Sequence, residues 1–161
     1  MNTLTRDALA AFLMVAKAET YAADDERRVR RLEDGGSEAG FARGELAYRD
    51  RWYGEARFAG QELVFHRGLP AWAMSFIGAT SPEAPPDFPH FHKRALRGAP
   101  AEAPFRGPPI YQEPSREGSL VYVNEWTGDL TWFRGVERVF SDGREVYRLE
   151  YHGGWLEPGA N

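Results

Sequence analysis

Residues 44–78 read GELAYRDRWYGEARFAGQELVFHRGLPAWAMSFIG, and residues 118–153 read GSLVYVNEWTGDLTWFRGVERVFSDGREVYRLEYHG. The two segments align at an offset of 74, or of 75 after one inserted residue, and 11 positions are then identical. Ordinary residue usage would give roughly two such identities. We therefore interpret the segments as internal repeats, which take priority over any other fold signal.

Each repeat predicts an antiparallel meander, because short aromatic and β-branched runs are separated by glycine-containing turns at hairpin spacing. The expected strands are 45–52, 56–58, 61–66 and 70–78 in the first copy, and 119–126, 130–133, 136–140 and 145–152 in the second.

A helix is expected before each meander. Near residues 3–18, Leu9, Phe12, Leu13 and Ala16 recur at helical spacing, and Thr3 or Thr5 is the expected N-cap. The second helix, near 88–96, lies in a Pro-rich segment, with Asp87 as its expected cap. The fold class is thus α+β: duplicated helix-plus-antiparallel-meander units forming a curved antiparallel sheet of six to eight strands, with two helices and a pseudo-two-fold axis.

Composition predicts a single domain over residues 1–161, since 42% of the 161 residues are hydrophobic and 27% are charged. The absence of cysteine excludes disulfides and thiolate metal sites. A net charge of -4 disfavours nucleic acid as a partner, and the mixed-charge segment 24–44 is expected to be a solvated connection. The sequence contains neither a signal peptide nor a membrane span, so we expect a cytoplasmic protein without a membrane partner.

Several polar residues interrupt faces that are otherwise apolar. Period-two alternation places Asp50 between Tyr48 and Trp52, and places Glu62 and Glu137 on faces shared with valines. A carboxylate in such surroundings must find a partner or shift its pKa. One interpretation is an aromatic-walled cavity at the pseudo-two-fold axis. The other is a fold device, in which each Glu accepts hydrogen bonds from a glycine bulge, a Tyr or an Arg. The candidate ligand-binding residues are Tyr48, Asp50, Trp52, Glu62, Trp72, Tyr122, Asn124, Trp126 and Glu137.

No metal or cofactor is expected. His90 and His92 lie two residues apart, so on a helix their imidazoles point apart. The common nucleophile, phosphate-loop and dinucleotide motifs are absent. The segment 105–109, with Arg106, is interpreted as a rigid entry into the second meander rather than an anion site.

The sequence resembles domain-of-unknown-function family 5680, an uncharacterised bacterial group. The resemblance rests on Phe12–Ala16, Thr20–Ala22, Tyr48-x-Asp50-x-Trp52-x-Gly54, Phe58-x-Gly60-x-Glu62-x-Val64, Arg106–Pro108 and Tyr151–Gly154. It implies no catalytic residues. Some members have a preceding Cro-like helix-turn-helix, which this sequence lacks, so no direct DNA-binding role is expected.

The preferred function is a small-molecule-binding or sensing domain, with an aromatic-lined groove and carboxylate anchors, rather than an enzyme. A first alternative is a small hydrolase that uses Glu62, Glu137 or His152 as general acid or base. A second is a protein-interaction module with a regulatory protein partner.

Overall fold

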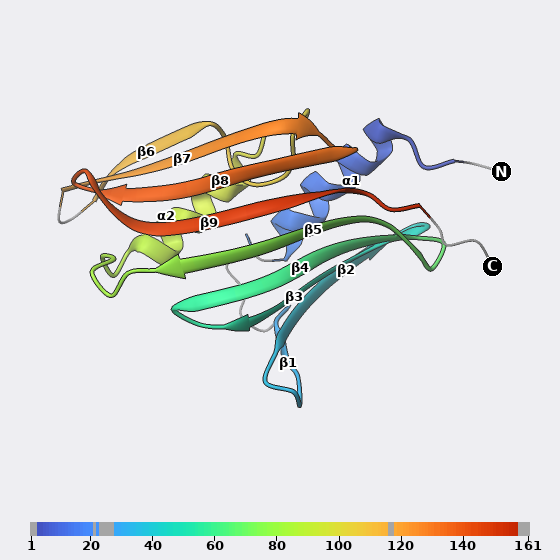
Figure 1. The fold of residues 1–161 in the computed structure, drawn as a ribbon, viewed down its shortest axis with the longest axis horizontal. Coiled ribbons are helices and arrows are strands. Elements are labelled where there is room, and N and C mark those ends of the chain that lie inside the picture. The colour runs from blue at the N-terminus through green and yellow to red at the C-terminus, as the bar shows by residue number, and fades with distance from the viewer. Residues whose placement is uncertain (1–2, 21, 23–27, 116–117, 158–161) are drawn as a thin grey trace.

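Two helices lie against one face of a curved antiparallel sheet in the computed structural model, which describes residues 3–20, 22, 28–115 and 118–157 (Figure 1). The helices are α1 (Arg6–Glu19) and α2 (Phe88–Arg97). The strands are β1 (Arg30–Arg31), β2 (Ser37–Arg43), β3 (Leu46–Gly54), β4 (Arg57–His66), β5 (Leu69–Thr80), β6 (Ile110–Ser115), β7 (Gly118–Asp129), β8 (Trp132–Ser141) and β9 (Arg144–Trp155). We call the face that carries the helices the inner face and the opposite one the outer face.

The sheet order is β1-β2-β3-β4-β5-β9-β8-β7-β6, so two meanders join through the central pair β5 and β9. The irregularities of the two halves correspond. A register shift follows Val64 in β4 and Val139 in β8. Gly54 and Gly128 both have a φ of 89°, a conformation that favours glycine. These correspondences are what a duplicated unit would produce, and the duplication itself stays a prediction.

The strand count of six to eight was too low, because the described residues form nine strands. Two of the additional strands, β1 and β2, lie within the segment 24–44 that we expected to be a solvated connection. The charged residues 24–27 of that segment lie outside the described residues. The third addition, β6, follows the Pro-rich segment.

Two pairs of predicted strands are single strands in the structure. Segments 56–58 and 61–66 fall within β4 except for residue 56, and segments 130–133 and 136–140 fall largely within β8. We had placed breaks at Gly60 and Gly135. Both glycines instead lie inside strands, where a neighbouring aromatic ring occupies the side-chain position. A Cβ at Gly60 would lie 2.4 Å from the backbone oxygen of Arg51 and 2.6 Å from the Phe76 ring, and one at Gly135 would lie 2.3 Å from the Tyr151 ring.

Replacing Gly135 by alanine is therefore expected to lower the free energy of unfolding by about 1–3 kcal/mol, the usual cost of overpacking a core. The added methyl group would displace the Tyr151 ring, whose hydroxyl donates to Asn124 Oδ1 at 2.8 Å. Urea denaturation measures the change. Gly40→Ala in β2 is the matched control, because the nearest atom to its Cβ would be 3.3 Å away. An equal loss in both variants would contradict the ring-packing explanation.

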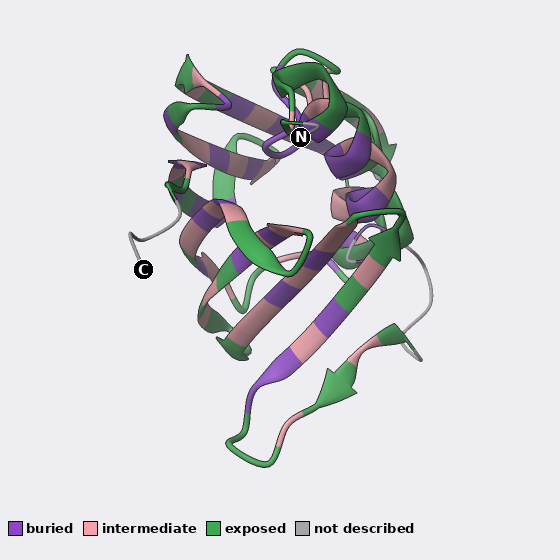
Figure 2. Ribbon diagram, turned by 90° about the vertical axis from the view of Figure 1, so that its right-hand side faces the viewer, coloured by how far each residue is buried: buried purple, intermediate pink, exposed green. Residues whose placement is uncertain are grey.

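The helices were predicted at nearly the right positions. Thr5 caps α1 by accepting a hydrogen bond from Ala8 N at 3.2 Å, whereas Asp87 precedes α2 without a side-chain cap. Helix α1 buries the predicted apolar stripe together with Lys17, and α2 buries Phe88 and Phe91. Figure 2 shows the sheet curving around these helices, with buried residues alternating along its strands. Neither helix of the described chain is long and apolar enough to cross a bilayer.

The Pro-rich connection after α2 enters the core. Phe105 is fully buried, and its ring stacks on Phe133 at a centroid distance of 3.9 Å. Because Phe105 is anchored in this way, the next residue, Arg106, is held between the helices and the sheet with only 5% of its surface exposed. Sequence alone indicated a rigid entry here, and did not indicate a buried cation.

Candidate functional site

A pocket of about 410 Å³ lies on the inner face and is lined by residues of α2 and of β3, β4, β5 and β9. Its walls are largely aromatic, and its polar lining includes one carboxylic acid from the sheet and several cationic side chains. The lining residues used below are Asp50, Trp52, Glu55, Phe58, Phe76, Phe88, His92, Lys93, Arg106 and Tyr147. The pocket combines an apolar surface with a few polar groups, which is the usual character of a small-molecule site.

Two pairs of buried polar residues lie at and beneath this pocket, at corresponding places of the two half-sheets. In the first half Asp50 of β3 pairs with Glu62 of β4, and in the second Asn124 of β7 pairs with Glu137 of β8. Period-two alternation correctly predicted that all four side chains face inward, and each is at most 4% exposed. Three of the four positions therefore bring a carboxyl group into the core.

Arg106 joins the two halves of this cluster. Its guanidinium nitrogens lie 2.6 Å from Glu137 Oε1 and 3.8 Å from Glu62 Oε1. Lys17 of α1 supplies a second buried cation, with Nζ 2.8 Å from Glu62 Oε2. Lys17 also donates to the backbone oxygen of Phe105 at 2.5 Å. Arg106 thus contacts both glutamates, and Lys17 forms a second ion pair with Glu62.

The carboxylate of Glu137 is surrounded by further hydrogen-bonding groups. Tyr122 and Tyr147 donate their hydroxyl protons to Oε2 and Oε1, at 2.6 and 2.7 Å. His92 of α2 places Nε2 at 3.1 Å from Oε1. Burial raises the pKa of both tyrosines well above its ordinary value, and the charge of Glu137 reinforces the shift. Both hydroxyls therefore remain protonated donors.

Asn124 is also fully engaged. Its Nδ2 donates to the backbone oxygen of Gly107 at 2.9 Å, while its Oδ1 accepts from Tyr151. The hydroxyl of Tyr122 in turn accepts from Gly107 N at 2.8 Å. The second half of the cluster is thus a closed network in which each polar group has its partner.

Asp50 differs from its counterpart Asn124. Among the described residues, no hydrogen bond reaches its Oδ1, although the side chain lines the pocket and is only 4% exposed. Burial raises the pKa of Asp50 well above its ordinary value, and the neighbouring charge of Glu62 raises it further. Burial therefore favours the neutral form of Asp50 more strongly than water would.

Burial and neighbouring charges shift the pKa values of Glu137 and Lys17 in opposite directions. Burial alone would raise the pKa of Glu137, but Arg106 and His92 overcome this effect and hold the pKa well below its usual range. Burial lowers the pKa of Lys17, and Glu62 counteracts part of that shift. Lys17 and Arg106 thus lie in ion-pair contact with the two buried glutamates, an arrangement that offsets part of the cost of burying these carboxyl groups.

The structure brings only some of the predicted site residues to the pocket surface. Asp50 and Trp52 line it, whereas Glu62, Tyr122, Asn124 and Glu137 form the network beneath. Tyr48 and Trp72 belong to the hydrophobic core, and the Trp72 indole donates to Leu130 O at 3.2 Å. Trp126 packs against the Phe105 ring at 6.4 Å, away from the pocket.

The pocket walls Phe58, Phe76, Phe88 and Tyr147 were not among the candidates, and neither were three basic residues of the cluster, Lys17, His92 and Arg106. The sequence does indicate that Lys17 faces the core, because it follows Ala16 and lies four positions after Leu13 on the apolar stripe of the helix. His92 was considered only as half of a metal pair; among the described residues no group of three or more His, Asp or Glu could hold a metal ion. Arg106 had no periodic signal, since no regular element places it.

Comparison with protein families gave one match that bears on this site. The family model described as "Domain of unknown function (DUF5680)" matches residues 50–156. The matched segment starts at Asp50 and includes Glu62, Arg106 and Glu137, but it excludes α1 and therefore Lys17. Comparisons with curated proteins and with solved structures gave no match.

Proposed function

The chain belongs to domain-of-unknown-function family 5680, as its resemblance predicted, and within that family we propose that it binds a small molecule in the inner-face pocket. The ligand class that suits the pocket is a compact aromatic or apolar ring carrying a protonated amine or amidine. The observation that carries the proposal is the buried acid of Asp50, a residue that lines the pocket and whose Oδ1 has no hydrogen-bond partner among the described residues.

The aromatic walls of the pocket are the argument for a ligand that contains a ring. Trp52, Phe58 and Phe76 lie on adjacent strands of the inner face, and Tyr147 and Phe88 complete the enclosure. A volume of about 410 Å³ lies in the range occupied by drug-sized ligands. Aromatic faces also attract cations, most strongly where water is excluded. The aromatic faces would therefore hold the ring of such a compound, while its charge would be offset by Asp50, because Arg31, Lys93 and Arg106 also line the pocket.

The position of Asp50 is the argument for a positively charged group on the ligand. A buried polar atom without a partner is costly, and a donor from the ligand would remove this cost. A protonated amine beside Asp50 would also favour its ionised form, so binding is expected to release a proton from Asp50 to the solvent. Glu62 and Glu137 would act as a frame, because their own cations already neutralise them.

The binding test compares naphthylmethylamine with the neutral naphthalenemethanol by isothermal titration. We expect the amine to bind more tightly, and we expect its heat to depend on the ionisation enthalpy of the buffer because a proton is released. Asp50→Asn is expected to weaken amine binding by about tenfold or more and to abolish the buffer dependence.

Glu55→Gln is the matched control, since it removes a carboxylate that lines the same pocket but is exposed. An equal effect of the two substitutions would assign the attraction to general electrostatics rather than to Asp50. Absence of binding by the amine at millimolar concentration would contradict the proposal.

Acid–base catalysis is less well supported by this arrangement. Glu62 and Glu137 are fully buried and paired with cations, and His152 lies on the outer face of β9. The three residues therefore do not share a cavity. The interaction module with a regulatory partner stays a prediction.

A further inference from the structure

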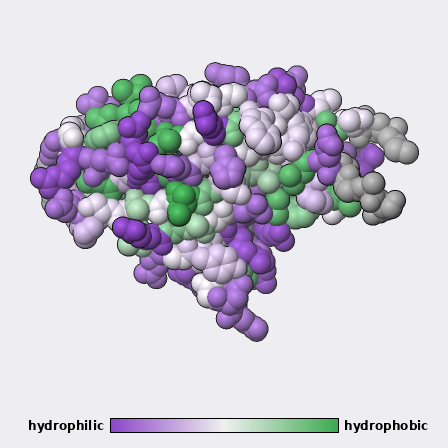
Figure 3. Space-filling view, viewed as in Figure 1, coloured by the Kyte–Doolittle hydropathy of each residue, from purple (hydrophilic) through white to green (hydrophobic). Residues whose placement is uncertain are grey.

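The outer face of the sheet has two hollows near its centre, on the side away from the proposed binding pocket. One, of about 870 Å³, extends from β5 across β9 and β8 to β7, and the other, of about 460 Å³, lies beside it. Figure 3 shows this face as a mixture of hydrophilic and hydrophobic residues. Ser75, Arg134 and His152 line both hollows, so these three residues form their common border.

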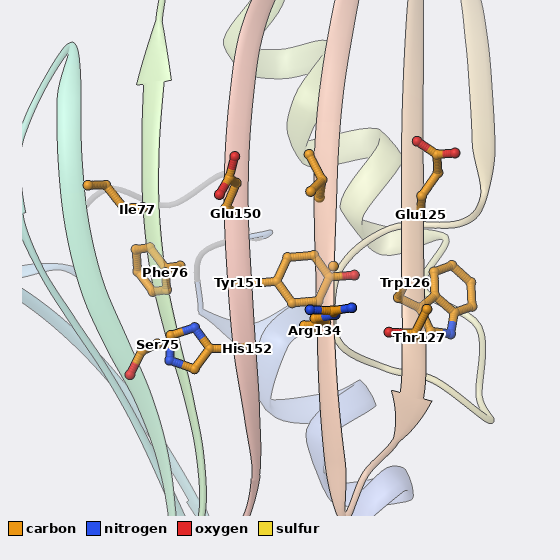
Figure 4. Close-up of a pocket in the computed structure, with 12 residues that line it drawn as sticks. Ser75, Phe76, Ile77, Glu125, Trp126, Thr127, Arg134, Glu150, Tyr151 and His152 are labelled. Atoms are coloured by element: carbon orange, nitrogen blue, oxygen red, sulfur yellow. The ribbon is translucent and has the colours of Figure 1, made fainter.

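A row of polar side chains crosses the face at this border. Ser75 of β5 pairs with His152 of β9, His152 pairs with Arg134 of β8, and Arg134 pairs with Thr127 of β7. Because paired residues on one face project side by side, the four side chains form a continuous line, which Figure 4 shows. The line contains a guanidinium, an imidazole and two hydroxyl groups, all of which donate hydrogen bonds.

The acidic residues near the row are paired with other arginines, which leaves the Arg134 guanidinium available to bind a ligand. Glu150 and Glu125 lie two residues along their strands from His152 and Thr127, but Glu150 is bound by Arg148 at 2.8 Å and Glu125 is bound by Arg138. Within the described part of the chain, no hydrogen bond or ion pair involves Arg134. An exposed guanidinium flanked by acids that already have partners is a ready binding group for an oxyanion.

The hydroxyl of Ser75 is similarly oriented for an external acceptor. Gln61 Nε2 donates to Ser75 Oγ at 3.1 Å, which occupies a lone pair of that oxygen. The hydroxyl proton of Ser75 is then left to donate elsewhere. Gln61 therefore prepares Ser75 as a donor at the same border.

A flat apolar surface lies directly beside this row. Trp132 is 82% exposed, and it pairs across β8 and β9 with Gly154, which has no side chain. Gly153 and Gly154 line the smaller hollow next to this indole. An exposed indole beside bare backbone offers one face for stacking a planar ring.

We propose that the outer face binds a planar ring compound carrying an oxyanion, with the ring on Trp132 and the oxyanion on Arg134, His152 and Ser75. Phosphate and carboxylate share the chemistry that this row recognises, namely several oxygens that accept hydrogen bonds from a guanidinium and its neighbours. The site is separate from the inner-face pocket, and its charge preference is opposite.

Three compounds with the same ring test the proposal: 2-naphthyl phosphate, 2-naphthoate and the neutral 2-naphthol. Binding is followed by isothermal titration and by the amide signals of β8 and β9. The phosphate or the carboxylate, or both, are expected to bind more tightly than naphthol. Which of the two binds more tightly identifies the oxyanion.

The substitutions separate the two parts of the site. Arg134→Ala is expected to weaken the anionic compounds by about tenfold and to leave naphthol unchanged, whereas Trp132→Ala weakens all three. Both residues are exposed, so neither variant should disturb folding. Arg144→Ala, which removes an exposed cation paired with Glu83 near the β8–β9 turn, is the control.

The proposal is overturned if none of the compounds binds at millimolar concentration, or if Arg134→Ala weakens naphthol as much as the anions. It is also overturned if Asp50→Asn, rather than Arg134→Ala, abolishes binding of the anions, because the compounds would then occupy the inner-face pocket.

Discussion

Replacing Arg106 by alanine is expected to lower the free energy of unfolding by about 3–5 kcal/mol, the cost of breaking a buried ion pair from one side. The substitution leaves Glu137 without its closest cation, at 2.6 Å in the native protein, and leaves Glu62 with Lys17 alone. Urea denaturation at neutral pH measures the loss. Arg106→Lys should restore part of it, because it retains the charge but not the planar fork.

The pH dependence of this loss distinguishes an electrostatic cause from a packing cause. In the native protein the pKa of Glu137 is lowered, so its stabilising contribution is present above the ordinary pKa of 4.5 and is lost as the pH falls through the lowered value. Without Arg106 that pKa rises. The deficit of the variant should therefore shrink as the pH falls below about 4.5.

A deficit that is constant with pH would contradict this explanation and would indicate lost packing around Phe105. The exposed pair of Arg144 and Glu83 supplies the reference, since Arg144→Ala should leave the free energy of unfolding nearly unchanged.

The central role of Arg106 also shows where sequence-based prediction ended. Alternation along the strands placed Asp50, Glu62, Asn124 and Glu137 on the inner face, because that pattern depends only on the pleat. The requirement that buried carboxylates find partners was likewise predictable. The partners were not, since Lys17 comes from α1, His92 from α2 and Arg106 from an irregular connection. No local period relates such distant segments.

The strand boundaries show a similar division. Glycines at true turns, such as Gly54 with its positive φ, were interpreted correctly from the sequence. Gly60 and Gly135 were misinterpreted as breaks, because the sequence does not distinguish a glycine required by a close neighbour from a glycine required by a turn.

The sequence did not decide whether Glu62 and Glu137 line a cavity or serve only to stabilise the fold. Their pairing with buried cations favours the second role for them and leaves Asp50 as the pocket acid.

Replacing Asp50 by asparagine is expected to stabilise the free protein at neutral and alkaline pH. The ordinary pKa of this acid is 3.8, and burial raises the pKa well above that in the folded state. Above pH 3.8 the unfolded chain loses this proton while the folded chain keeps it, so the contribution of Asp50 to stability falls as the pH rises. The loss continues, by about 1.4 kcal/mol per pH unit, until the pH passes the raised pKa.

Asparagine has no proton to lose, and the corresponding position of the second half-sheet already holds Asn124. The difference in unfolding free energy between Asp50→Asn and the native protein should therefore grow from pH 4 to pH 8, as urea denaturation across that range would show. Asn124→Asp is the mirror variant. It should destabilise the protein at neutral pH, because it places a second acid beside Glu137 and removes the hydrogen bond to Gly107 O.

A constant difference between pH 4 and pH 8 would mean that Asp50 is not held neutral in the folded protein, and the expected proton release on amine binding would then lose its basis. A growing difference would mean that the chain keeps an acid where an amide would be more stable. A residue that lowers stability at its working pH is expected where it serves a function, since strain and uncompensated polar groups are tolerated mainly at sites of binding or catalysis. The same substitution thus tests stability and function together, and the two effects should have opposite signs: a more stable protein that binds the amine less tightly.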